Sequence, residues 1–178
     1  MDKLQTVDLP QGYFLRQGSV LDKPLLLKFL NRTYQELSAD ENFGHLSNTL
    51  NAYFSQETPV WWVETGQNRQ ENSPCLPSFS SSQSRRTPVA CLWLGLAIDQ
   101  LTGDRHAHVF LLYVSQLHRR RGIGRSLMQL AERWARERGD RQIGLQVFQD
   151  NDPALNLYRA LGYETQSLWM IKSLDSSA

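Results

Sequence analysis

The sequence is poor in cysteine and in long apolar runs. Its 178 residues include two cysteines, Cys75 and Cys91, too few for a disulfide framework or a zinc site. We interpret both as reduced thiols. No apolar run approaches the roughly 20 residues that span a bilayer, and Met1 to Pro10 has no apolar signal-peptide core. We therefore expect a cytoplasmic protein with no membrane partner.

The sequence also lacks net charge. Lysine and arginine total 19 against 18 acidic residues, which leaves a formal charge of +1. Such a balance gives no general attraction for nucleic acid, so we expect no nucleic-acid partner and only a local anion site. One possible function is that of an RNA-binding protein that uses Arg119 to Arg121. This hypothesis rests on a single cluster of basic residues.

The length suits one domain, which we place over residues 1–178. One compositional break interrupts it: residues 72–87 hold six serines and two prolines. This composition predicts a flexible loop, over about residues 66–87, rather than a linker between domains.

Hydrophobic periodicity and turn residues predict the elements. Strands are expected at residues 13–19, 60–64, 89–98, 106–114, 143–148 and 168–171. Helices are expected after Asp22, through Leu46 to Phe54, from Ile123 to a cap at Gly139, and after Pro153. The order places antiparallel strands first and a β-α-β-α-β run last. This predicts an α/β (mixed α+β) fold with six to seven strands in a mixed sheet and helices on both faces.

The most informative segment joins a strand to a helix at residues 114–128, VSQLHRRRGIGRSLM. The first amides of a helix lack intrahelical acceptors, and the helix dipole adds partial positive charge there. Gly122 and Gly124 have no Cβ, so a phosphate can approach the backbone. The segment is typical of a pyrophosphate site, although a tight turn with solvated arginines explains it equally well. It is not a Walker A loop, and Leu127 breaks the dinucleotide-binding glycine pattern.

Two motifs resemble those of the GNAT superfamily of N-acetyltransferases. RRRGIG at 119–124 matches the family pattern of Arg or Gln, two residues, Gly, one residue, then Gly or Ala. VFQDNDPALNLYRALGY at 147–163 matches its second motif. The two stand in the family's order, and the detailed resemblance covers about residues 106–171.

The resemblance implies acetyl-CoA as the acyl donor and a splayed central pair of parallel strands. It places the pantetheine arm along the strand that contains Leu112, Tyr113 and Val114, with the Leu112 amide polarising the thioester carbonyl. Main-chain amides would hold the pyrophosphate, from Arg119, Arg120, Arg121, Gly122, Ile123, Gly124 and Arg125.

The resemblance also assigns catalytic candidates. Tyr158 corresponds to the tyrosine that donates a proton to the leaving thiolate; without the family it is a packing residue on an apolar stripe. Asn151 corresponds to an asparagine that contacts pantetheine, or simply begins a helix.

The general base is less defined. Family members place a glutamate where this chain has His108 or Gln146. His108 can accept a proton near neutral pH, whereas Gln146 cannot. His106 and His108 can equally be two histidines on a partly wet strand, and Glu64 with a water chain stays open.

We expect direct attack by a primary amine, from a small molecule or a peptide, in a ternary complex without a metal. Glu36, Asp40 and Glu41 could attract a cationic acceptor, or form a solvated loop. The alternative function is a non-catalytic acyl-CoA sensor or interaction domain on the same fold. A homodimer and a monomer both stay open.

Overall fold

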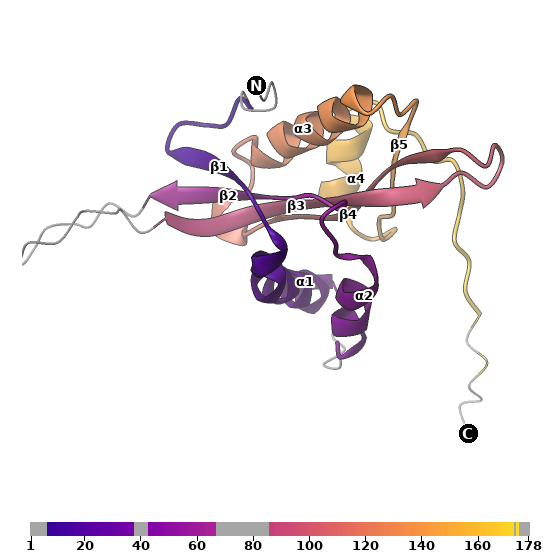
Figure 1. The fold of residues 1–178 in the computed structure, drawn as a ribbon, viewed down its shortest axis with the longest axis horizontal. Helices are drawn as coiled ribbons and strands as arrows, with labels where there is room; N and C mark the ends of the chain where they lie inside the picture. The colour runs from indigo at the N-terminus through magenta and orange to yellow at the C-terminus, as the bar shows by residue number, and fades with distance from the viewer. Residues whose placement is uncertain (1–6, 38–42, 67–85, 173, 175–178) are drawn as a thin grey trace, which may run out of the picture. The chain divides into compact units, whose positions relative to one another are not determined.

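The computed structural model describes residues 7–37, 43–66, 86–172 and 174 (Figure 1). Most of the predicted serine-rich loop, with Cys75, lies outside the described residues, as do Asp40 and Glu41. The chain divides into two compact units, residues 1–146 and 147–178, and each is described by itself.

The first unit is built on a five-stranded sheet in the order β1-β2-β3-β4-β5. Its first four strands pair antiparallel, and β4 and β5 pair in parallel, which confirms the predicted mixed sheet. The strands are β1 (Tyr13–Gln17), β2 (Val60–Gly66), β3 (Arg86–Ile98), β4 (Arg105–Val114) and β5 (Ile143–Leu145).

Helices cover both faces of this sheet, as predicted (Figure 1). Neighbouring residues of β2 show the two faces, because successive strand side chains point in opposite directions. Trp62 packs edge-on against Phe29 of α1, whereas Trp61 contacts Trp134 of α3. The helices are α1 (Lys23–Leu37) and α2 (His45–Tyr53) on one face and α3 (Ile123–Glu137) on the other.

The sheet opens beside β4. Parallel pairing with β5 ends at Val109 and Leu145, although β4 continues to Val114. β5 is therefore shorter than the predicted strand at 143–148, and the predicted splay of the parallel pair is confirmed. On the β3 side the register shifts around Phe110, which is the extra residue of a β-bulge.

The second unit contains α4 (Asp152–Arg159), whose first turn has the predicted proline. Asn151 is the N-cap, which agrees with the interpretation that it begins a helix, and Gly162 adopts φ 87° after the helix. The prediction of a strand at 168–171 is wrong: the segment has no strand structure and its side chains are 77–89% exposed. Four consecutive apolar residues do not specify a strand without a pairing partner, and no described strand supplies one.

Candidate functional site

The loop between β4 and α3 has an unusual backbone. A 3₁₀ turn, η3 (Gln116–His118), leads to Arg120 at φ 61° and Gly122 at φ 87°, and α3 begins at Ile123. The left-handed conformation costs a non-glycine residue such as Arg120 about 1–2 kcal/mol. A Cβ on Gly122 would meet nothing within 4 Å, so the backbone there faces open space.

Backbone donors gather along this loop. The N–H groups of residues 120–125 donate to no described acceptor, and the first bond into α3 is from Ser126 N–H to the Gly122 carbonyl, at 3.0 Å. Gly122 supplies no side-chain cap. Arg119 differs from the other residues whose amides were predicted to hold the pyrophosphate, because its N–H donates to the Gln116 carbonyl at 3.3 Å. Six amides without a described acceptor, gathered at a helix start, are backbone donors of the kind that can bind an anion.

The arginine side chains of the loop divide into two pairs. Arg119 donates from Nε to the Val114 carbonyl at 2.8 Å and pairs with Glu36 of α1. Arg121 donates to the hydroxyl of Tyr13 at 3.1 Å. Arg120 and Arg125 are exposed, and neither guanidinium forms a hydrogen bond or an ion pair with a described residue. These two guanidinium groups are therefore the ones of the loop that no described residue engages.

Two contacts of this loop could not be predicted from local sequence. Glu36 reaches Arg119 across 83 positions, and Tyr13 contacts His118 across 105 positions, at 2.9 Å between the hydroxyl and Nδ1. No motif spacing links residues so far apart. Glu36, which the sequence associated with a possible acceptor site, contacts Arg119 of the loop before α3.

The edge of β4 offers further backbone groups. Ser115 donates its N–H to Val89 of β3 at 2.8 Å. By the two-residue period of a strand, Leu112 and Val114 direct their N–H groups to the opposite edge, where β5 has ended. The Val114 carbonyl already accepts from Arg119. Leu112 and Val114 thus present unpaired amides beside the bulge.

Tyr113 was predicted, with Leu112 and Val114, to lie on the strand that binds the pantetheine arm, but its side chain points into the core. Its side chain lies in the core with 6% exposure and packs edge-on against Phe29. Its hydroxyl donates to Glu36 Oε1 at 2.8 Å. Burial and the Glu36 carboxylate raise the pKa of Tyr113 to about 12, so the hydroxyl stays protonated.

His108 lies where the parallel strands separate. It pairs with Gly95 of β3 and Gly144 of β5, one residue before parallel pairing ends, and its ring is 5.4 Å from that of Phe110. Burial, and then the charge of His106, lower the pKa of His108 below 6.5. A neutral imidazole at physiological pH can accept a proton.

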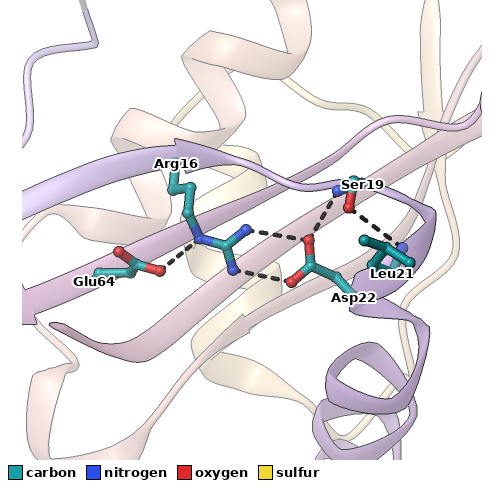
Figure 2. A network of polar contacts seen from close by, with 5 residues as sticks. All are labelled: Arg16, Ser19, Leu21, Asp22 and Glu64. Atoms are coloured by element: carbon teal, nitrogen blue, oxygen red, sulfur yellow. Dashed lines mark hydrogen bonds and ion pairs between the residues drawn. The ribbon is translucent and has the colours of Figure 1, made fainter. Parts of the chain in front are cut away.

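Glu64 is less suited to that task. Arg16 donates to Glu64 Oε1 at 2.6 Å and also to both oxygens of Asp22, forming the network of Figure 2. Glu64 pairs with Pro88 of β3, whereas His108 pairs with Gly95. Seven residues of strand separate these partners, roughly 23 Å. Glu64 therefore lies far from His108, and its carboxylate forms an ion pair with the Arg16 guanidinium.

The C-terminal unit holds the other two predicted residues. Tyr158 is buried, with its ring 5.8 Å from that of Tyr163, and burial raises the pKa of Tyr158 to about 12. The Asn151 side chain accepts from the Ala154 N–H at 3.3 Å. Tyr158 is therefore a protonated donor at neutral pH, and Asn151 has a helix-capping role.

Other kinds of site find little support in the described part of the chain. It contains no group of three or more metal-ligating side chains. None of its helices is long and apolar enough to cross a membrane. Cys91 is buried, and burial raises the pKa of its thiol far above the usual range, which leaves it unreactive.

Comparison with known families gives one match that spans both units. The model of the acetyltransferase (GNAT) family matches residues 45–163. A Bacillus subtilis protein described as an uncharacterized N-acetyltransferase, YdgE, is 30% identical over 82 residues, which cover 46% of this chain and 52% of that protein. A mycothiol acetyltransferase of Corynebacterium efficiens is 27% identical over 161 residues, 86% of this chain and 51% of that one. The chain thus spans about half the length of each of these two relatives.

Solved structures share the fold. A protein described as a predicted acetyltransferase, from Clostridium acetobutylicum with acetyl-CoA, has a TM-score of 0.65 at 16% identity and covers 91% of this chain and 96% of its own. An aminoglycoside acetyltransferase from an uncultured soil metagenomic sample, in complex with sisomicin, has a TM-score of 0.61 at 18% identity. That match covers 92% of this chain and 97% of the other.

Proposed function

Because the chain belongs to the acetyltransferase (GNAT) family, we propose that it is an N-acetyltransferase that transfers an acetyl group from acetyl-CoA to a primary amine in a ternary complex. One observation carries the choice of donor. The six amides of residues 120–125 donate to no described acceptor and surround the start of α3. Linked phosphates are the ligands that such a set binds.

The residues present fit a coenzyme of this kind. The amides of 120–125 hold the pyrophosphate, Gly122 leaves room for it, and the exposed side chains of Arg120 and Arg125 add charge. The unpaired N–H groups of Leu112 and Val114 bind the pantetheine arm along the open edge of β4. We assign Asn151 to the same arm, in addition to its cap.

The chemistry assigns a proton acceptor and a proton donor. His108 takes the proton that the amine loses as its nitrogen bonds to the thioester carbonyl carbon. The Leu112 N–H stabilises the charge that develops on the carbonyl oxygen. As the carbon–sulfur bond breaks, Tyr158 gives its proton to the thiolate. Solvent returns a proton to Tyr158 and removes one from His108, so charge and atoms balance.

Both compact units take part in this proposal. The loop and His108 belong to residues 1–146, and Tyr158 and Asn151 belong to residues 147–178. The family match covers residues 45–163 and so includes all of these positions. We propose that residues 1–178 are one domain of this family.

The acceptor is a primary amine. Among the relatives, a streptothricin acetyltransferase of Streptomyces lavendulae is 48% identical over 46 residues, which cover 26% of this chain and 24% of that protein. Together with the aminoglycoside acetyltransferase, it supports a small-molecule amine as the first acceptor class to test, with peptide amines second.

Release of free CoA thiol from acetyl-CoA tests the function. The purified chain is mixed with a panel of aminoglycosides, polyamines and peptides, and thiol is measured with and without each amine. The proposal predicts thiol release that depends on at least one amine and yields its N-acetyl product by mass. Binding of CoA with no turnover across the panel would instead identify an acyl-CoA sensor.

A further inference from the structure

The carboxylate of Glu36 lies in a partly exposed cluster at the end of α1. Its Oε1 accepts from the Tyr113 hydroxyl at 2.8 Å, and its Oε2 pairs with the Arg119 guanidinium. The side chains of Glu36 and Arg119 are 27% and 42% exposed, so solvent screens a part of their attraction. This acid is therefore engaged with the loop before α3.

Arg119 uses its own donors within the chain. Its Nε donates to the Val114 carbonyl at 2.8 Å, and its guanidinium lies 5.9 Å from the centre of the Tyr113 ring. The side chain thus connects the last residue of β4 to the last turn of α1. These contacts hold the guanidinium against the ends of β4 and α1.

That conformation needs support. Arg120 is the one non-glycine residue with positive φ in the described ranges, at 61°. Such strained backbone persists only where its surroundings fix it. Arg119 is fixed by Glu36 on one side of this residue, and Arg121 by the Tyr13 hydroxyl on the other.

We infer that Glu36 is a positioning residue for coenzyme binding, which acts through Arg119 to hold the loop in the form that presents its amides. Glu36 contacts no phosphate and no reacting atom. The inference rests on the proposed function, because it takes the bound anion to be the pyrophosphate of CoA. The competing account is that Arg119 binds phosphate directly and that Glu36 only competes for it.

The two accounts predict opposite changes in the affinity for CoA when Glu36 is replaced, in Glu36→Gln. The amide keeps the length and an oxygen for Tyr113, but it lacks the charge that holds Arg119. If Glu36 positions the loop, the Kd of CoA rises about fivefold to twentyfold, the size of a lost charge-assisted hydrogen bond. The kcat at saturating acetyl-CoA changes less than about twofold, since no reacting group is altered. If Glu36 only competes, the variant binds CoA more tightly.

Further variants show whether CoA binding depends on the geometry of the Arg119 guanidinium or only on its charge. Arg119→Lys keeps the charge but cannot bond Val114 and Glu36 with one planar fork, so we expect weaker CoA binding, as in Glu36→Gln. If Glu36 acts only through Arg119, the double variant Glu36→Gln/Arg119→Gln should lose no more affinity for CoA than Arg119→Gln alone. Glu132→Gln is the matched control, because it breaks the exposed pair with Arg136 on α3 and should leave CoA affinity unchanged.

Calorimetric titration of CoA into each full-length variant, with the melting temperature as a folding check, gives the answer. Weaker binding by Glu36→Gln and Arg119→Lys, with non-additive losses in the double variant, supports the inference. Unchanged or tighter binding by Glu36→Gln overturns it, and so does wild-type affinity in Arg119→Lys should Glu36→Gln fail to fold. Absence of CoA binding by the wild-type protein would instead contradict the proposed function.

Discussion

The ring of Phe110 on β4 lies over the backbone of Gly95 on β3, so closely that a Cβ on Gly95 would be 1.9 Å from the ring's Cε2 atom. Phe110 is the bulged residue of β4, and its ring also lies 4.8 Å from that of Trp93. Gly95 is the Cα partner of His108. A glycine on one strand therefore makes room for the bulge beside the proposed base.

Alanine at position 95 tests this packing. Because the ring cannot stay in place, Gly95→Ala should destabilise the fold by about 1–3 kcal/mol, the usual cost of overpacking. Urea unfolding followed by fluorescence measures the change. Gly66→Ala is the control, since a Cβ there meets nothing within 4 Å and no positive φ is required. Equal unfolding midpoints for the two variants would contradict the predicted overpacking at Gly95.

Two glycines of positive φ separate coenzyme binding from backbone strain. Gly122 precedes α3 at φ 87° and Gly139 follows it at φ 83°, and a Cβ on either meets nothing within 4 Å. Alanine at either position should cost about 1–2 kcal/mol of stability. Only Gly122→Ala should also weaken CoA binding, because its Cβ projects where the phosphates bind. Thermal melting and CoA titration of both variants check this, and equal CoA affinities would argue against a site at Gly122.

The pH profile tests His108. Its pKa is lowered below 6.5, so the imidazole is neutral at pH 7, and kcat/KM should fall as pH drops through that lowered value. His108→Asn should abolish this acidic limb and lower kcat by about a hundredfold or more. His106→Asn should keep the limb but move it to higher pH, because the His106 charge contributes to the lowered pKa of His108. A limb that survives in His108→Asn and disappears in Glu64→Gln would make Glu64 the base.

Removal of one hydroxyl tests the proton donor. Tyr158 has a pKa of about 12 in its buried site and is protonated at every pH at which the enzyme is assayed. Tyr158→Phe should lower kcat by about tenfold to a thousandfold while the Kd of acetyl-CoA changes little. Steady-state kinetics and calorimetry together make the measurement. A variant with unchanged kcat would leave Tyr158 as a packing residue.

Much of the fold was predictable because its signals are local. Apolar periodicity and Gly139 define α3, and the glycine-rich loop before it follows from residues 119–124. The mixed sheet follows from the order of elements. The strand predicted at 168–171 fails because a short apolar run does not reveal whether a pairing partner exists.

The backbone of the candidate site could be predicted from the sequence, but the side-chain contacts that hold the loop could not. The amides of the loop follow from the motif, whereas Glu36 and Tyr13 meet the loop only through the packing of α1 and β1. The orientation of Tyr113 depends on the register between β3 and β4, which a bulge shifts by one residue. Contacts of this kind are properties of the folded chain and leave no mark at short sequence separation.

Calorimetric titration of acetyl-CoA into the wild-type protein tests the account most directly. Saturable one-to-one binding that weakens in Gly122→Ala and persists in Gly139→Ala is the predicted result. No heat of binding at millimolar acetyl-CoA or CoA, from protein shown to be folded, would contradict it.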